Sequence, residues 1–130
     1  MRIVILLTLI ACNTFQPPIV HHYHFPSTQA FLDKPDRPFE KIGVVRAKVN
    51  YQSLDPSHEE DALCRNYYNK AVRQLVTLAE AKGAQAVIQV QSVVFYENGR
   101  QEFYSTPECS DDGLEGQSLV TGVAIRYTDH

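Results

Sequence analysis

The sequence predicts an α+β protein in which one long helix packs on a small mixed sheet, in the order strand, helix, strand, strand, strand. The first observation is that apolar side chains recur at helical spacing over residues 55–82. The second is that the segments on both sides are rich in Val and Ile, or alternate between apolar and polar residues. Because a strand–helix–strand unit lays its helix on one face of a sheet, these segments predict a two-layer domain over residues 39–130.

The N-terminus is typical of a secretory signal. Arg2 precedes an apolar run over residues 3–11, which is much shorter than the about 20 residues that span a bilayer. The run ends in Leu-Ile-Ala-Cys at residues 9–12, which looks like a bacterial lipobox. That likeness implies cleavage before Cys12, so that residues 1–11 form the signal peptide, and acylation of the Cys12 thiol. The alternative is a buried strand with an incidental cysteine.

Residues 12–38 are predicted to form a tether between the lipid and the domain. They hold five of the seven prolines and show no sustained apolar period. Because proline fixes φ and removes a hydrogen-bond donor, neither a helix nor a central strand suits this segment. Asn13, next to Cys12, favours an outer-membrane location facing the periplasm. The lipid bilayer is therefore the first expected partner, through acylated Cys12.

Three histidines within this tether could bind a transition metal: His21, His22 and His24. No cysteine or carboxylate lies beside them, and a flexible segment does not fix a coordination geometry. We therefore interpret them as part of a solvated linker and predict no metal and no cofactor.

The domain is predicted to begin with a strand over residues 39–51, which is rich in Val, Ile and aromatic residues and is interrupted by basic ones, so that one face is partly exposed. The helix follows. Ser57 and Glu60 form a capping box, and Gly83 supplies the left-handed residue after the last turn. The expected buried stripe of the helix consists of Cys64, Tyr68, Ala71, Val72, Leu75, Leu78 and Ala79.

Three further strands complete the predicted sheet. Residues 84–97 alternate, which places Ala86, Ile88, Val90, Ser92 and Val94 on one face, where the polar Ser92 needs a hydrogen-bond partner or an edge position. Asn98-Gly99 predicts a type I′ hairpin turn into residues 100–105. A loop over residues 107–117 leads to the last strand, residues 118–128. Gly122 within it indicates a close backbone approach or a bulge.

Charge and cysteine content limit the function. The net charge is −3, and no cluster of basic residues occurs, which argues against nucleic acid as a partner. If Cys12 is acylated, Cys64 and Cys109 remain, and an even remainder in an exported domain predicts one disulfide. The alternative is two free, buried thiols.

Several short motifs together resemble a family. A cysteine near the helix start is followed by Ala and Leu at helical spacing, then by Gly-Ala-Gln-Ala-Val at residues 83–87, and the chain ends in Gly-Val-Ala-Ile-Arg-Tyr at residues 122–127. With the lipobox and the tether, this pattern resembles the RcsF and DUF4156-type bacterial lipoproteins and, more remotely, the YbjQ-like domain.

The resemblance implies a lipid-anchored, non-enzymatic envelope protein that acts by binding other envelope proteins, with outer-membrane barrel machinery and envelope stress signalling as the expected context. Cys64 and Cys109 match one of the two RcsF disulfides. Ser92 and Val120 stand at the positions of the other, and Tyr127 stands where some relatives carry cysteine.

Other functions compete with this hypothesis. A hydrolase would need a nucleophile with a base in reach, and outside the tether only His58 and His130 could serve as that base. A small ligand- or metal-binding domain is the main alternative, with an acidic loop that comprises Glu108, Asp111, Asp112 and Glu115. An apolar face on the hairpin (Val93, Phe95 and Phe103) would either mark an assembly interface or pack under the tether.

Overall fold

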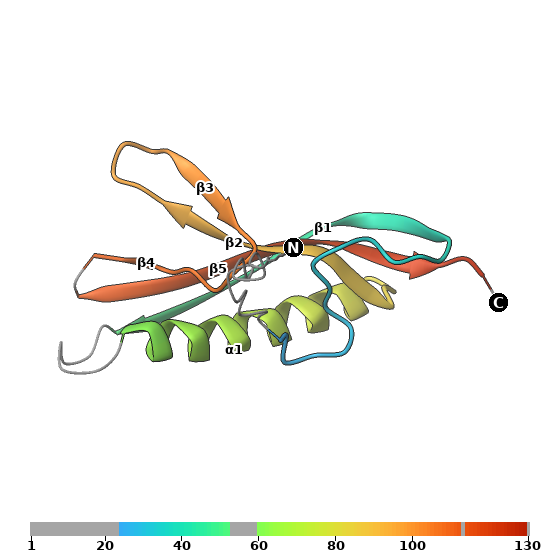
Figure 1. The fold of residues 1–130 in the computed structure, drawn as a ribbon, viewed down its shortest axis with the longest axis horizontal. Coiled ribbons are helices and arrows are strands. Elements are labelled where there is room, and N and C mark those ends of the chain that lie inside the picture. The colour runs from blue at the N-terminus through green and yellow to red at the C-terminus, as the bar shows by residue number, and fades with distance from the viewer. Residues whose placement is uncertain (1–23, 53–59, 113, 130) are drawn as a thin grey trace, which may run out of the picture.

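The computed structural model describes residues 24–52, 60–112 and 114–129. It confirms an α+β fold in which one long helix lies along one face of a sheet (Figure 1). The elements are β1 (Phe39–Gln52), α1 (Glu60–Ala81), β2 (Ala86–Phe95), β3 (Gln101–Tyr104), β4 (Ser110–Asp111) and β5 (Glu115–Tyr127).

The sheet has the strand order β1-β5-β2-β3, and β4 pairs with β5 beside this path. All four pairings between these strands are antiparallel, so the predicted mixed sheet is wrong in this respect. The reason is that β5 inserts between β1 and β2. The two strands that flank the helix in the sequence therefore run in the same direction without pairing with each other.

The helix buries one stripe against the sheet. Tyr68, Ala71, Val72, Leu75 and Ala79 are fully buried or nearly so, as the apolar spacing predicted. The prediction was wrong for Leu78, which is 45% exposed, whereas Val76 is only 6% exposed. The buried stripe therefore contains most of the predicted one and is rotated slightly around the helix, away from Leu78 and toward Val76.

The C-terminal end of α1 forms as expected. Gly83 adopts a positive φ of 87°, its N–H donates to the Glu80 carbonyl at 2.9 Å, and the Ala84 N–H donates to the Ala79 carbonyl at 3.0 Å. These two bonds are those of a Schellman motif. The predicted capping box lies at Ser57, outside the described residues.

Strand β1 extends one residue beyond its prediction and alternates as expected. Val45, Ala47 and Val49 belong to the core cluster under α1, and Arg46 and Lys48 are exposed between them. Because the outer edge of β1 carries no neighbouring strand in the described sheet, charged side chains there discourage edge-to-edge aggregation.

Strand β2 contains a bulge that its sequence did not reveal. Gln89 has a φ of +55°, and the register with β5 shifts between Ile88 and Gln91. The extra residue reverses the alternation, so Val87 and Val90 join the core under α1 while Ala86 and Ile88 pack on the opposite face. The single predicted face of this strand is therefore wrong.

The β2–β3 turn also differs from its prediction. The Tyr96 N–H donates to the Arg100 carbonyl and the Gly99 N–H to the Tyr96 carbonyl, which leaves a three-residue loop. A type I′ turn needs positive φ at both Asn98 and Gly99, but of these two only Gly99 has it, at 84°. This geometry is the three-residue hairpin loop with glycine in the left-handed position.

The end of the chain forms more strand than predicted. The loop expected over residues 107–117 contains β4, and β5 begins at Glu115, because the two strands pair with each other. The close approach expected at Gly122 is confirmed. A Cβ there would lie 2.5 Å from Cγ1 of Val87 and 3.2 Å from the Ile88 carbonyl oxygen.

The last part of the predicted tether contacts the domain. Ala30 is buried and forms a parallel bridge with Val87, which donates its N–H to the Gln29 carbonyl at 2.8 Å. Phe25 packs against the core cluster. Within the described residues, contacts with the sheet therefore begin before Phe39, where the domain was expected to start.

Candidate functional site

Strand β2 leaves β5 halfway along its length, and this point, which we call the fork, organises the candidate site. The β2–β5 pairing ends at Ser92 opposite Val120, and β4 then takes the place of β2 beside β5, with Ser110 opposite Gln117. Figure 1 shows the β2–β3 hairpin rising away from the β4–β5 pair. The sheet therefore opens into two layers at this end.

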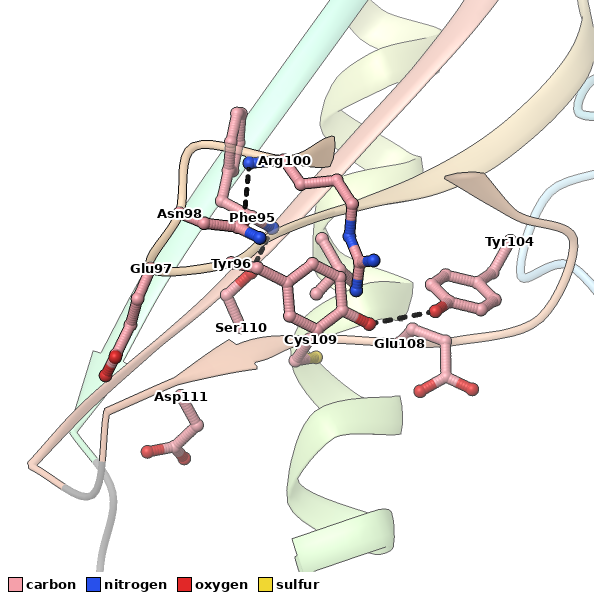
Figure 2. A pocket seen from close by; sticks show the side chains of 11 residues that line it. Phe95, Tyr96, Glu97, Asn98, Arg100, Tyr104, Glu108, Cys109, Ser110 and Asp111 are labelled. Carbon is pink, nitrogen blue, oxygen red and sulfur yellow. Dashed lines mark hydrogen bonds between the residues drawn. The ribbon is translucent and has the colours of Figure 1, made fainter. Parts of the chain in front are cut away.

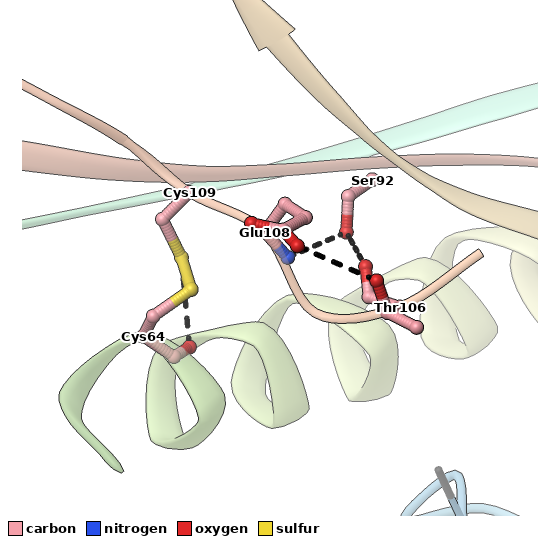
Figure 3. The surroundings of a disulfide bond; sticks show 5 residues. All are labelled: Cys64, Ser92, Thr106, Glu108 and Cys109. Carbon is pink, nitrogen blue, oxygen red and sulfur yellow. Dashed lines mark hydrogen bonds between the residues drawn. A yellow bond between two sulfur atoms is a disulfide. The ribbon is translucent and has the colours of Figure 1, made fainter. Parts of the chain in front are cut away.

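Ser92 holds the returning chain at the fork. Its side chain is fully buried, its hydroxyl donates to the Thr106 carbonyl at 2.8 Å, and it accepts the Glu108 N–H at 3.1 Å (Figure 3). The partners expected for a buried serine are thus backbone groups of the segment between β3 and β4. Because both bonds reach the same segment, Ser92 fixes its path.

A disulfide ties the same segment to the helix. Cys64, in the first turns of α1, is joined to Cys109, with the two Cα atoms 5.9 Å apart (Figure 3). This is the pair that the sequence predicted. The bond closes a loop of 45 residues, which stabilises a fold by about 4 kcal/mol in the chain-entropy account.

An open cleft lies between the hairpin and the segment that carries β4 (Figure 2). We call it the hairpin cleft. Its volume is about 780 Å³, within the range of roughly 300–1,000 Å³ that ligand sites occupy. The hairpin side consists of residues 94–98, Arg100 and Tyr104, and the other side consists of residues 108–111.

Two tyrosines and a glutamate form a hydrogen-bonded group at the cleft. The Tyr104 hydroxyl donates to the Glu102 carboxylate, and the Tyr96 hydroxyl lies 3.0 Å from that of Tyr104 and 3.3 Å from the carboxylate. The bond from Tyr104 lowers the pKa of Glu102, and the same bond raises the pKa of Tyr104. Both groups therefore keep these protonation states at neutral pH.

The charges at the cleft are mostly negative. Glu97, Glu108 and Asp111 line it, and Arg100 is the one cation among its lining residues. The Arg100 guanidinium lies 4.8 Å from the centre of the Tyr96 ring and 3.4 Å from Glu102, so it is already engaged. A ligand that enters the cleft therefore meets aromatic rings and carboxylates.

The predicted acidic loop divides between two roles. Glu108 and Asp111 line the cleft, whereas Asp112 accepts the N–H groups of Leu114 at 2.9 Å and Glu115 at 2.7 Å. These bonds, that from Glu115 first, lower the pKa of Asp112. In the part of the chain that the structure describes, no three His, Cys, Asp or Glu side chains are grouped to hold a metal ion.

Several of the residues singled out in the sequence lie outside the part of the chain that the structure describes. Cys12, His21 and His22 lie outside the described residues, as do His58 and His130, and His24 is exposed. Among the described residues, no helix combines the length and the apolar character needed to cross a membrane.

The apolar face expected on the hairpin is smaller than predicted. Phe95 and Phe103 are 40% and 49% exposed, but Val93 is buried. Val93 pairs with Phe103 across the hairpin, next to the pair of Ser92 and Tyr104. Of the three predicted residues, only Phe95 and Phe103 therefore contribute to an exposed apolar surface on the hairpin.

Sequence reasoning missed the tyrosine–glutamate group and Arg100. The available signal was the alternation around the turn, because Tyr96, Glu102 and Tyr104 fall on one face of a paired hairpin. This alternation places the three side chains on one face only if the pairing register of the two strands is known. The predicted type I′ turn would have set a different register.

Comparisons with known proteins concern the fold. No protein-family model matches the chain, and no curated protein matches it significantly. A similar chain occurs in the crystal structure, at 2.73 Å resolution, of a protein with unknown function from the DUF74 family of Pediococcus pentosaceus. The TM-score is 0.54 at 12% identity, and the match covers 75% of this chain and 95% of that chain. At this identity the likeness concerns the arrangement of the elements alone.

Proposed function

We propose that this chain is a non-enzymatic, lipid-anchored protein of the bacterial cell envelope that binds other envelope proteins through the hairpin cleft. The observation that carries the proposal is the Cys64–Cys109 disulfide at one wall of that cleft. A disulfide suits an oxidising compartment outside the cytoplasm, and a fixed wall lowers the entropic cost of binding.

The envelope location rests on the N-terminal sequence. The lipobox-like Leu-Ile-Ala-Cys at residues 9–12 supports removal of a signal peptide and acylation of Cys12, with a proline-rich tether behind it. A lipoprotein that carries two or more acyl chains stays on the bilayer without a membrane span. Asn13 supports the outer membrane, with the domain facing the periplasm.

The side chains of the cleft favour a role in binding over a role in catalysis. The Ser110 hydroxyl accepts the Phe95 N–H at 3.1 Å, and the Tyr96 and Tyr104 hydroxyls bond to each other (Figure 2). Both hydroxyls also bond to Glu102. These hydroxyls therefore hold the walls in place. The resemblance to RcsF-type lipoproteins suggests envelope stress sensing or signalling as the context.

The location is tested by intact mass of the membrane-extracted protein before and after reduction. We expect the mass of a chain that starts at acylated Cys12, with a gain of two hydrogens on reduction. Cys12→Ser should leave the protein unprocessed or release it from the membrane. Wild-type protein recovered from the cytosol with Met1 in place would refute the proposed location.

Binding is tested by photo-crosslinking in cells that produce the full chain. A photoreactive phenylalanine analogue replaces Asn98, which is exposed and lines the hairpin cleft, and in a matched control it replaces Leu78, which is exposed on α1. We expect envelope proteins to be captured from position 98 and not from position 78. Equal capture from both positions, or none, would count against binding at the hairpin.

A small ligand-binding envelope domain is the second candidate, and the cleft volume favours it. The two candidates differ in size of ligand. A small ligand would stay bound in native mass spectrometry of the purified protein, and no partner would be crosslinked at position 98.

A further inference from the structure

We infer that the hairpin cleft accepts an extended, basic segment of its protein partner, in which Lys or Arg side chains enter between the tyrosines and the carboxylates. This inference rests on the proposed function and adds the chemistry of the partner. Three features of the cleft carry it: two fixed walls, a negative balance of charge, and aromatic rings beside the carboxylates.

Both walls of the cleft are held before any partner arrives. On the hairpin side, the hydroxyls of Tyr96 and Tyr104 bond to each other and to Glu102. On the other side, Ser92 bonds the Glu108 N–H at 3.1 Å, and Cys109 is covalently joined to α1. Fixed walls bind with a smaller loss of conformational entropy than mobile loops do.

The charge of the cleft selects a cation. Three carboxylates line it against Arg100 alone, and Arg100 is already paired with Glu102 at 3.4 Å. Tyrosine rings attract cations over their faces, as Arg100 over Tyr96 shows within the same site. Lys and Arg side chains match both features, whereas an acidic or phosphate-bearing ligand would be repelled.

The shape of the cleft selects an extended chain. It lies between a strand pair on one side and the short strand β4 on the other, and it opens to solvent (Figure 2). A peptide in strand conformation projects alternate side chains to one side, so it could place successive basic residues toward Glu97 and Glu108. The open cleft does not enclose a small ion.

The test uses the full chain in detergent and a fluorescent, end-capped octapeptide of alternating Lys and Thr. Its binding is measured by fluorescence anisotropy, with a Glu–Thr octapeptide as the charge-reversed probe. We expect the Lys–Thr peptide alone to bind, and its affinity to fall as salt rises, because these charges are exposed.

The decisive variant is the double substitution Glu97→Gln with Glu108→Gln. We expect about fivefold weaker binding of the Lys–Thr peptide, since two exposed ion pairs are lost. The matched control is Glu80→Gln on the exposed side of α1, which should leave binding unchanged. Cys64→Ser with Cys109→Ser should also weaken binding, because the wall that carries Cys109 is released.

The following results would overturn the inference: no binding of the Lys–Thr peptide, equal binding of the Glu–Thr peptide, or equal weakening by Glu80→Gln. Spermine that competes as well as the peptide at equal charge would indicate a site for small cations and would also overturn it. Crosslinking at position 98, which lines the cleft, distinguishes failure of this inference from failure of the proposed function. A captured partner without peptide binding defeats this inference and leaves the proposed function standing, whereas the loss of both defeats the proposed function.

Discussion

The two ends of the sheet are stabilised in different ways. Under the C-terminal half of α1, side chains such as Leu75, Val87 and Ala124 are fully buried, and Gly122 lets the sheet approach the helix closely. At the forked end, one buried serine and one disulfide hold the segment that leads from the hairpin into β4. Burial thus maintains the scaffold, and a few directional bonds maintain an open cleft that hydrophobic packing would close.

Removing the disulfide is the largest change we expect at the forked end. The double variant Cys64→Ser with Cys109→Ser should lower the free energy of unfolding by about 4 kcal/mol, because a loop of 45 residues is no longer closed in the unfolded chain. Urea unfolding of the wild type and the variant measures this difference. Addition of a reductant should destabilise the wild type and leave the variant unchanged. A wild type that is insensitive to reductant would mean that the bond does not hold the fork.

The next largest effect is expected from shortening a buried side chain under the C-terminal half of α1. Leu75→Ala should cost about 3 kcal/mol, because a fully buried leucine leaves a cavity among the surrounding side chains. Its control is Leu78→Ala, which removes the same atoms from a half-exposed position on the same helix and should cost less than about 1 kcal/mol. Thermal or chemical unfolding gives both values. Equal losses would contradict the observed side of helix packing.

Ser92→Ala should have a smaller and more local effect. It leaves the partly buried Thr106 carbonyl and Glu108 N–H without their shared partner, at a cost of about 2 kcal/mol. We expect faster hydrogen exchange in residues 105–111 and no comparable change in α1. Ser105→Ala, at a neighbouring exposed position, serves as the control. Exchange that rises evenly across the domain would contradict a role confined to the fork.

The smallest effect concerns the ionisation of Glu102. The hydrogen bond from Tyr104 holds the pKa of this carboxyl below its ordinary 4.5 in the folded state. Its contribution to stability is therefore present above that ordinary value and is lost as the pH falls through the lowered one. An NMR titration of the carboxyl carbon should give a midpoint below 4.5, and Tyr104→Phe should move it upward. An unchanged midpoint would contradict the bond.

Local sequence patterns were sufficient to predict the structure wherever residues close in the sequence decide the conformation. The helical spacing of Tyr68, Val72, Leu75 and Ala79, the stop at Gly83 and the exposed basic residues of β1 were all predictable from the sequence. The pairing of Cys64 with Cys109 followed from counting cysteines in a chain expected to be exported. Each of these depends on a helical or strand period, or on composition, which the sequence displays directly.

Tertiary structure alone decided the bulge at Gln89, the insertion of β5 between β1 and β2, and the fork at Ser92. These features depend on which residues far apart in the sequence pair across the sheet, and a one-residue shift exchanges the two faces of a strand. The same shift decides whether Tyr96, Glu102 and Tyr104 share a face. The hairpin cleft follows from this register, because an open site exists only where one strand has left another.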